Sequence, residues 1–135
     1  MKLTPELYYL ALVATATVLM WIPYMGARIL TRGPWRTFAN PTDPGFPPDP
    51  AWAERARRAH ANAIENLAVF ATLVIIAALV GVSTPATIMA AKTYFGARLV
   101  HYLVYAAGLP VIRTLAFMAG FVATIVVAHA VFSAV

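Results

Sequence analysis

Residues 54–66 read E-R-A-R-R-A-H-A-N-A-I-E-N, and residues 67–80 continue directly as L-A-V-F-A-T-L-V-I-I-A-A-L-V. The first stretch is dense in charged and amide side chains, whereas the second carries no charge. No glycine or proline separates the two, so the pattern predicts one helix that begins among polar groups and ends in lipid. A helix of about 30 residues is roughly 45 Å long, which exceeds the ~30 Å hydrocarbon core of a bilayer. Its polar half must therefore project from the core or lie among other helices.

The composition is that of an integral membrane protein. Of the 135 residues, 61% are hydrophobic and 11% are charged, whereas soluble domains carry roughly 25% charged residues. The length suits a single domain over residues 1–135. The absence of cysteine excludes disulfides, thiolate zinc sites and a cysteine nucleophile. The net charge of +5 comes from basic residues that flank apolar stretches as topology signals do, so we expect no nucleic-acid partner.

Apolar runs of membrane-spanning length recur along the chain, since about 20 such residues cross a bilayer core. The first run is uncharged between Glu6 and Arg28 and ends at Trp21 and Tyr24, two residue types that favour the headgroup layer. Pro23 is expected to kink this helix. The sequence predicts an all-α membrane protein, a four-helix bundle with spans over about 6–29, 51–80, 85–107 and 110–134.

Segments rich in proline and glycine separate the spans. Residues 31–50 contain six prolines and form a loop, whose aromatic residues are expected to hold it against the membrane surface. We expect Asp49 to cap the second span, with Pro50 as its first helical residue. Thr84 is expected to cap the third span in the same way, ahead of Pro85.

The basic residues favour one orientation across the membrane. Arginines gather at the two helix ends that face loop 31–50, whereas the opposite side carries Lys2 alone. The positive-inside rule therefore places this loop in the cytoplasm and both termini outside. The small size and short loops favour a multi-pass protein of a bacterial inner membrane.

The polar half of the second span presents one stripe. Arg58, Asn62 and Glu65 are spaced at i, i+4 and i+7, so they share a helix face, and Arg55 extends it at i−3. The neighbouring His60 lies off this face and is expected to serve packing or a subunit contact.

The third span presents a second stripe at the same depth. Arg98, His101 and Tyr105 are spaced at i, i+3 and i+7. Antiparallel threading places them level with the first stripe, with Arg28 at the end of the first span and with Arg113 in the first turn of the fourth. Ionisable groups inside a membrane are costly and usually face a bundle interior or a wet cavity. The two stripes therefore predict a polar pocket.

The charge of this pocket indicates its ligand. Its arginines outnumber its acidic residue, Glu65, so a molecule with carboxylates would complete it, because a carboxylate can bind a guanidinium in bidentate fashion. Glu65 could receive an ammonium group. A small zwitterionic molecule with more than one carboxylate fits these residue types, and no metal site is expected, because the three histidines lack ligand spacing.

The E-R-A-R-R-A-H-A-N-A-I-E-N string, the later A-R-L-V-H-Y-L-V-Y and the following P-V-I-R-T resemble the MAPEG superfamily, the membrane-associated proteins in eicosanoid and glutathione metabolism. The resemblance covers nearly the whole chain and is closest to its microsomal glutathione transferase and prostaglandin E synthase-like members. It implies a homotrimer of four-helix subunits, with glutathione as cosubstrate bound between neighbouring subunits near the cytoplasmic side.

The resemblance also implies roles for individual residues. Arg113 would lie beside the glutathione sulfur and favour the thiolate, with the hydroxyl of Thr114 next to it. The thiolate would attack a lipophilic electrophile from the bilayer or reduce a hydroperoxide. The residues expected to bind glutathione are Arg28, Arg58, Asn62, Glu65, Arg98, His101, Tyr105 and Thr114.

Three positions depart from the prostaglandin E synthase-like pattern. Ala61 stands where those members carry a further arginine, Thr114 where they carry a serine, and Phe117 where they carry a tyrosine. The alternative is therefore a non-catalytic lipid-binding or scaffold protein of the same fold. A third hypothesis is a transporter or proton pathway, which the lack of a visible internal repeat disfavours. Its relay groups would be Lys92, Arg98, His101 and Glu65.

Overall fold

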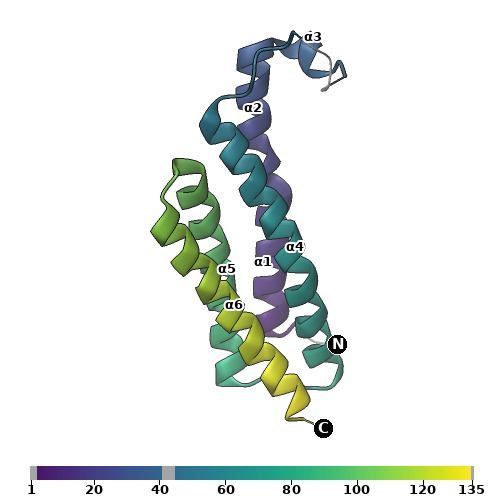
Figure 1. Cartoon of the computed structure of the whole chain (residues 1–135). Coiled ribbons are helices and arrows are strands. Elements are labelled where there is room, and N and C mark those ends of the chain that lie inside the picture. Colours follow the sequence, from purple (N-terminus) through teal and green to yellow (C-terminus); the bar gives the residue numbers. More distant parts are fainter. Residues whose placement is uncertain (1–2, 41–44, 135) are drawn as a thin grey trace.

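The computed structural model describes residues 3–40 and 45–134, and this part of the chain contains helices and no strand. Lys2 and the section of loop 31–50 at 41–44 lie outside the described residues. The helices, shown in Figure 1, are α1 (Pro5–Leu19), α2 (Trp21–Arg32), α3 (Pro34–Thr37), α4 (Ala51–Leu79), α5 (Pro85–Ala107) and α6 (Pro110–Phe132).

The first predicted span is a rod of two helices, α1 and α2, that is interrupted at Met20. The disturbance expected from Pro23 is thereby confirmed. A proline has no N–H to bond the carbonyl four residues earlier, and its ring crowds that carbonyl, which here belongs to Leu19. The Tyr102 hydroxyl donates a hydrogen bond of 2.8 Å to the Met20 carbonyl, so the interruption is held against α5.

The predicted start of α4 near residue 51 is confirmed, but the predicted capping by Asp49 and the helical position of Pro50 are wrong. The helix begins at Ala51, and Pro50 precedes it without any side-chain capping bond. Asp49 does not cap the helix, because its carboxylate accepts hydrogen bonds from Arg28 Nε at 3.0 Å and Nη2 at 2.6 Å. A charge-assisted pair of bonds to a guanidinium is stronger than one bond to a neutral backbone N–H.

The predicted start of α5 is confirmed. The Thr84 side chain accepts a bond from the Thr87 backbone N–H, and Pro85 occupies the first helical position. Loop 31–50 is less irregular than expected, because α2 continues to Arg32 and the short helix α3 follows it.

Three stretches of the described chain are long and apolar enough to cross a membrane, namely Pro5–Arg32, Ala51–Leu79 and Pro110–Phe132. These are the dimensions of an integral membrane protein. Helix α5 was expected to be a fourth span, and it has a similar length. It is absent from this set because Lys92, Arg98 and His101 lower its hydropathy.

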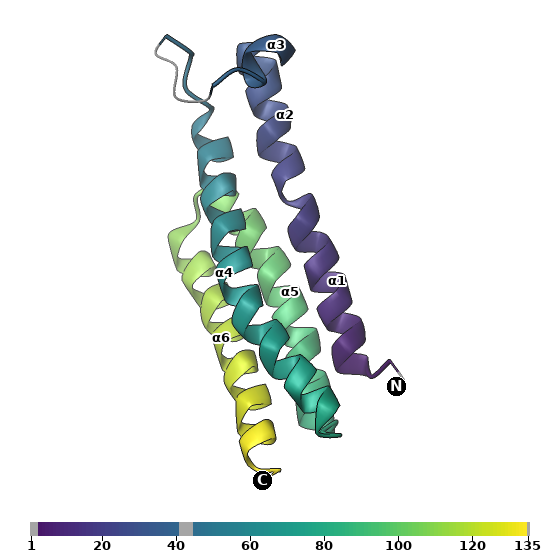
Figure 2. The same cartoon turned by 90° about the vertical axis from the view of Figure 1, so that its right-hand side faces the viewer.

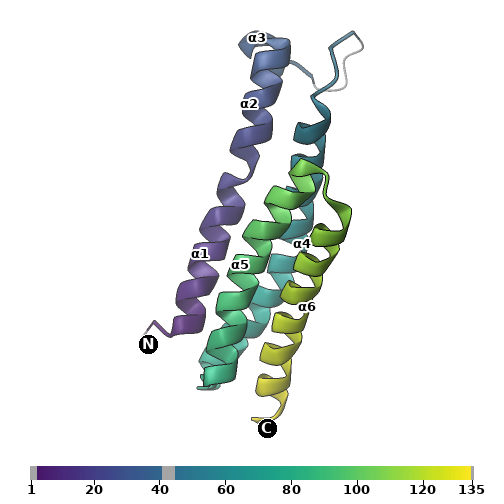
Figure 3. The same cartoon turned by 90° about the vertical axis from the view of Figure 1, so that its left-hand side faces the viewer.

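Helix α5 packs against α1, α4 and α6, most extensively against α6. Both termini and the α4–α5 turn lie at one end of the molecule, which we call the terminal end (Figure 3). Helix α3 lies at the opposite, loop end, where α2 and the first turns of α4 extend past the α5–α6 turn (Figures 1 and 2). The apolar core includes Phe70, which stacks on Tyr94 at 3.7 Å between ring centroids, and Val74 and Val127. The predicted polar residues lie between this core and the loop end.

Candidate functional site

Arg98 on α5 is the centre of the polar cluster. Its side chain is fully buried, with 1% of the residue exposed. Nη1 donates a hydrogen bond of 2.9 Å to Oδ1 of Asn62 on α4. The guanidinium carbon lies 5.4 Å from the centroid of the Tyr94 ring and 5.5 Å from that of Phe117 on α6. Three helices therefore hold this cation through one amide oxygen and two aromatic faces.

The other donors of Arg98 are not satisfied within the described part of the chain. Nε and Nη2 are buried and have no hydrogen-bond acceptor there. The Tyr94 hydroxyl is also buried and has no hydrogen-bond partner there. A Cβ at Gly120 would lie 3.0 Å from Nη2 and 3.2 Å from Nε. Because Gly120 has no side chain, it leaves room for the Arg98 guanidinium.

A run of rings connects Arg98 to the start of α6. His101 is buried, with its ring edge-on to Tyr105 at 5.5 Å between centroids and tilted against Phe117 at 6.3 Å. The guanidinium carbon of Arg113 lies 4.6 Å from the centroid of the Tyr105 ring. The structure therefore brings together Asn62, Arg98, His101, Tyr105 and Arg113 from α4, α5 and α6.

The remaining predicted site residues do not join this cluster. The Arg58 side chain is 65% exposed and approaches Glu54 at 3.4 Å. Glu65 is exposed and has no hydrogen-bond or ion-pair partner within the described residues. The exposed Thr114 donates its hydroxyl hydrogen to the Pro110 carbonyl at 3.0 Å. All three residues lie on outward faces of α4 and α6.

Arg55 does not extend the Arg58 stripe as predicted. Its Nε donates a hydrogen bond of 3.0 Å to the Ala106 carbonyl in the last turn of α5. A guanidinium there satisfies a free carbonyl and interacts favourably with the helix dipole. Gly108 follows with φ of 80°, and a Cβ at this position would lie 3.3 Å from Arg55 Nε. Arg55 therefore holds the end of α5 against α4.

His60 makes the packing contact that was expected of it. Its Nδ1 lies 2.9 Å from the Tyr24 hydroxyl, which joins α4 to α2. The sequence analysis did not single out Tyr94 and noted Phe117 only as a missing tyrosine, although both rings cover Arg98. The i, i+4 spacing of Tyr94 and Arg98 is the signal that could have found the first.

Sequence reasoning also missed a buried carboxylate at the terminal end. Glu6 on α1 is 2% exposed. It accepts hydrogen bonds from the Thr87 hydroxyl at 2.6 Å and from the Ser83 hydroxyl at 3.0 and 3.1 Å. These bonds tie α1 to the first turn of α5, far from the Arg98 cluster.

Arg28 belongs to a separate polar hollow, which we call the loop-end hollow. It has a volume of about 560 Å³ and lies between α2, the segment before α4 and the first turns of α4. Arg28 and Arg32 both approach Asp49, at 2.6 and 3.4 Å, and Arg57 approaches Glu54 at 2.7 Å. The residues that line it are Arg28, Arg32, Pro48, Asp49, Glu54 and Arg57.

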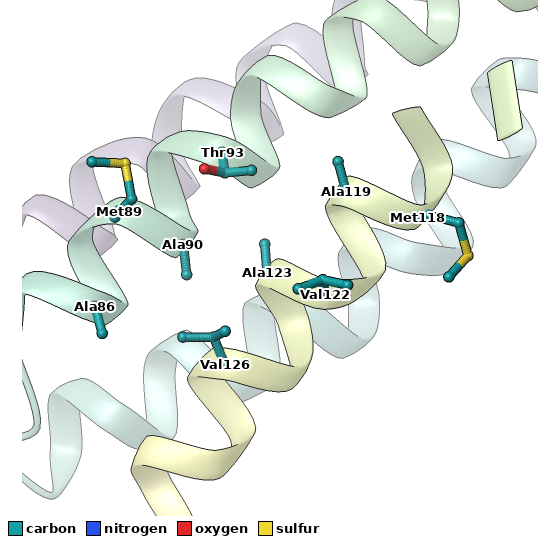
Figure 4. Close-up of a pocket in the computed structure, with 9 residues that line it drawn as sticks. All are labelled: Ala86, Met89, Ala90, Thr93, Met118, Ala119, Val122, Ala123 and Val126. Carbon is teal, nitrogen blue, oxygen red and sulfur yellow. The ribbon is translucent and has the colours of Figure 1, made fainter. Parts of the chain in front are cut away.

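An apolar groove of about 510 Å³ runs between α5 and α6 (Figure 4). Met89 contributes to it from α5 and Met118 from α6, and small side chains separate them (Figure 4). The outward face of α6 continues from Met118 towards a smaller hollow of about 300 Å³ beside Thr114. The groove residues are Ala86, Met89, Ala90, Thr93, Met118, Ala119, Val122, Ala123 and Val126.

The MAPEG family model matches residues 7–133 of the chain. The match covers both polar stripes, the start of α6 and nearly the whole sequence, so the predicted resemblance is confirmed. A search of curated proteins finds no match.

Proposed function

Because the chain belongs to the MAPEG family, we propose that it is a membrane-bound glutathione-dependent transferase or peroxidase that acts on lipophilic electrophiles or hydroperoxides. The observation that carries the proposal is the placement of Arg113 over the Tyr105 ring, at 4.6 Å. The Arg113 guanidinium has no carboxylate partner within the described residues. Arg113 is therefore held in place by the ring, and its charge can still stabilise a thiolate beside it.

The proposed chemistry begins with the glutathione thiol. The Arg113 guanidinium lowers the pKa of a thiol beside it because it stabilises the anion. The thiolate sulfur attacks an electrophilic carbon, a C–S bond forms, and the leaving group departs with the electron pair. With a hydroperoxide, the thiolate sulfur attacks the terminal oxygen, the O–O bond breaks, and the alkoxide takes a proton and leaves as alcohol. A second glutathione thiol then attacks the oxidised sulfur, and the oxygen leaves as water while the disulfide forms. The protein contributes orientation and electrostatics.

The glutathione backbone would lie along the facing stripes of α4 and α5. In one subunit Arg113 lies against the Tyr105 ring, which contacts His101, and Asn62 is joined to the same cluster through Arg98. Arg58 and Glu65 are exposed on α4, so in this proposal they bind a ligand that a neighbouring subunit shares.

A homotrimer is part of the proposal. An exposed carboxylate such as Glu65, set in a membrane helix without a partner among the described residues, is costly unless another polar surface covers it. A second copy of the chain supplies such a surface. The proposed location is a bacterial inner membrane, with loop 31–50 in the cytoplasm and both termini outside.

The lipophilic substrate would approach along α6. The apolar groove (Figure 4) and the hollow beside Thr114 are both lined by residues of this helix. A hydrocarbon chain in the groove would direct a reactive group towards Thr114 and Arg113. Thr114 would lie next to the sulfur and donate its hydroxyl hydrogen there in place of Pro110.

The test is a titration of glutathione into the purified protein, followed by thiolate absorbance and by calorimetry. Arg113→Ala should lower the thiolate absorbance while glutathione still binds, and Arg36→Ala, an exposed arginine on α3, should leave both unchanged. Failure of the parent protein to bind glutathione would contradict the proposal. Lipophile binding without any effect of glutathione would identify the non-catalytic alternative, which the missing hydroxyl at Phe117 favours.

A further inference from the structure

The loop-end hollow has no part in the proposed thiol chemistry, yet it is polar, open and rich in arginine. We propose that it binds the phosphate of an anionic phospholipid headgroup. The inference does not depend on glutathione, since it rests on the depth, the charge and the surroundings of this hollow alone.

The depth of the hollow matches the headgroup layer. The rod Pro5–Arg32 has 28 residues, so at 1.5 Å per residue it is about 42 Å long, against about 30 Å for the hydrocarbon core. Its last turns, which carry Arg28 and Arg32, therefore lie beyond the core if the terminal end meets the opposite surface. Figures 1 and 2 show α2 and the start of α4 extending together past the α5–α6 turn.

The charge of the hollow suits one phosphate. Three guanidinium groups face two carboxylates there, because Asp49 is shared by Arg28 and Arg32 while Glu54 binds Arg57. Among the described residues that line the hollow, one positive charge remains. Arg28 and Arg57 each bind their carboxylate through Nε and Nη2, and Nη1 of each makes no hydrogen bond within residues 3–40 and 45–134, so it can bind a further acceptor. Guanidinium groups bind phosphate oxygens with this geometry, and basic pockets between membrane helices bind anionic headgroups.

The surroundings favour a lipid over a soluble anion. Leu30 at the end of α2 is 89% exposed, and Trp35 and Phe38 of the α3 segment are 86% and 81% exposed. Large apolar and aromatic side chains at a helix end are typical of the membrane interface. Ile22 and Ile29 are also exposed on α2, and they extend an apolar face from the arginines towards the bilayer core. Acyl chains attached to a bound phosphate would lie along this face.

The test compares phosphatidylglycerol with phosphatidylcholine, added to the protein in neutral detergent. Arg57→Gln removes one guanidinium from the hollow, and Arg36→Gln removes the same charge from α3 outside it. Phosphatidylglycerol should raise the melting temperature of the parent and of Arg36→Gln, with a bound lipid in native mass spectra. In Arg57→Gln its affinity should fall about tenfold, the equivalent of one lost charged contact. The melting temperature in phosphatidylcholine shows whether each variant is folded.

Three outcomes would overturn the inference. Equal losses in Arg36→Gln and Arg57→Gln would mean that overall charge, not the hollow, attracts the lipid. Protection by inorganic phosphate equal to that by phosphatidylglycerol would assign the hollow to a soluble anion. Competition between glutathione and phosphatidylglycerol would assign it to the thiol site. Thiolate absorbance, measured in the same Arg57→Gln sample, should be unchanged, so failure of the lipid site is distinguishable from failure of the proposed function.

Discussion

Nη1 of Arg98 on α5 donates a hydrogen bond of 2.9 Å to Oδ1 of Asn62 on α4. This bond fixes the orientation of the amide, because Oδ1 is committed to the guanidinium and Nδ2 is left to donate elsewhere. Arg98 itself is buried among Tyr94, Phe117 and Gly120. Within the described residues Arg98 therefore positions Asn62, and its contact with glutathione stays a prediction.

Asn62→Leu should destabilise the protein by about 1.5–3 kcal/mol, because it removes the acceptor of a hydrogen bond from a buried cation. Asn66→Leu is the matched control. Asn66 Nδ2 donates to the Asn62 carbonyl within the same helix, so its loss should cost about 1 kcal/mol or less. Thermal unfolding in detergent measures both variants. Equal losses would show that the Asn62 side chain contributes no more than a local helix contact.

Gly120→Ala should destabilise the protein by about 1–3 kcal/mol, because overpacking a filled interior forces neighbours to shift. The new Cβ would lie 3.0 Å from Arg98 Nη2, whereas a Cβ at Gly96 would meet no atom within 4 Å. Gly96→Ala should be neutral or stabilising by up to about 1 kcal/mol through helix propensity. Glutathione affinity should fall in Gly120→Ala and persist in Gly96→Ala. If glutathione affinity were unchanged in both variants, Arg98 would have no role in glutathione binding.

The helix boundaries follow from local signals, and so the sequence predicts them well. Thr84 and Pro85 start α5 as expected, since an N-cap and a first-turn proline act within a few residues. Asp49 is the exception. Its partner Arg28 is 21 residues away in the chain, and no local rule reveals that this guanidinium would compete with the helix N-terminus.

The site is predicted less completely than the helix boundaries. Helical periodicity shows which residues share a helix face, but not which residues of different helices lie within contact distance. The stripes correctly place Asn62 and Arg98 on facing helices. The same stripes include Arg58 and Glu65, which are exposed on α4 and do not contact the Arg98 cluster within the described residues. Arg28 lies towards the loop end as expected, but its partner is Asp49 and not a residue of the two stripes. Phe117 covers Arg98 with a ring face, a contact that carries no polar signal in the sequence.

Gly108→Ala should cost more stability than Gly81→Ala. Both glycines have positive φ, at 80° and 75°, so alanine at either position is strained by about 1–2 kcal/mol. A Cβ at Gly108 would also press on the Arg55 guanidinium at 3.3 Å, whereas Gly81 has no atom within 4 Å. We expect an additional loss of about 1 kcal/mol, the value of the Arg55 bond to Ala106. In an Arg55→Ala background the two glycine variants should become equal, as a double-mutant cycle in unfolding free energy would show.

Glu6→Leu should loosen the terminal end without affecting the site. The substitution leaves the hydroxyls of Ser83 and Thr87 without their shared acceptor, at a cost of about 1–3 kcal/mol. Thr15→Ala is the control, because the exposed Thr15 hydroxyl bonds a carbonyl of its own helix and should be nearly neutral. Thermal unfolding measures the loss, and thiolate absorbance with glutathione should stay the same in both variants. A fall in thiolate for Glu6→Leu alone would couple the two ends of the molecule.

The aromatic ring of Tyr105, and not its hydroxyl, should support the proposed thiolate. The ring face lies 4.6 Å from the Arg113 guanidinium carbon, and such a contact contributes about 0.5–2 kcal/mol. A guanidinium beside the bound thiol lowers the thiol pKa below its usual value of about 8.5, so thiolate should form at a lower pH on the protein than in solution. In Tyr105→Leu the guanidinium loses its support, and the midpoint of thiolate absorbance against pH should move upwards towards the free value. In Tyr105→Phe the ring remains and the midpoint should stay that of the parent. Equal upward shifts in both variants would show that the hydroxyl acts on the thiol directly, as a ligand-binding group.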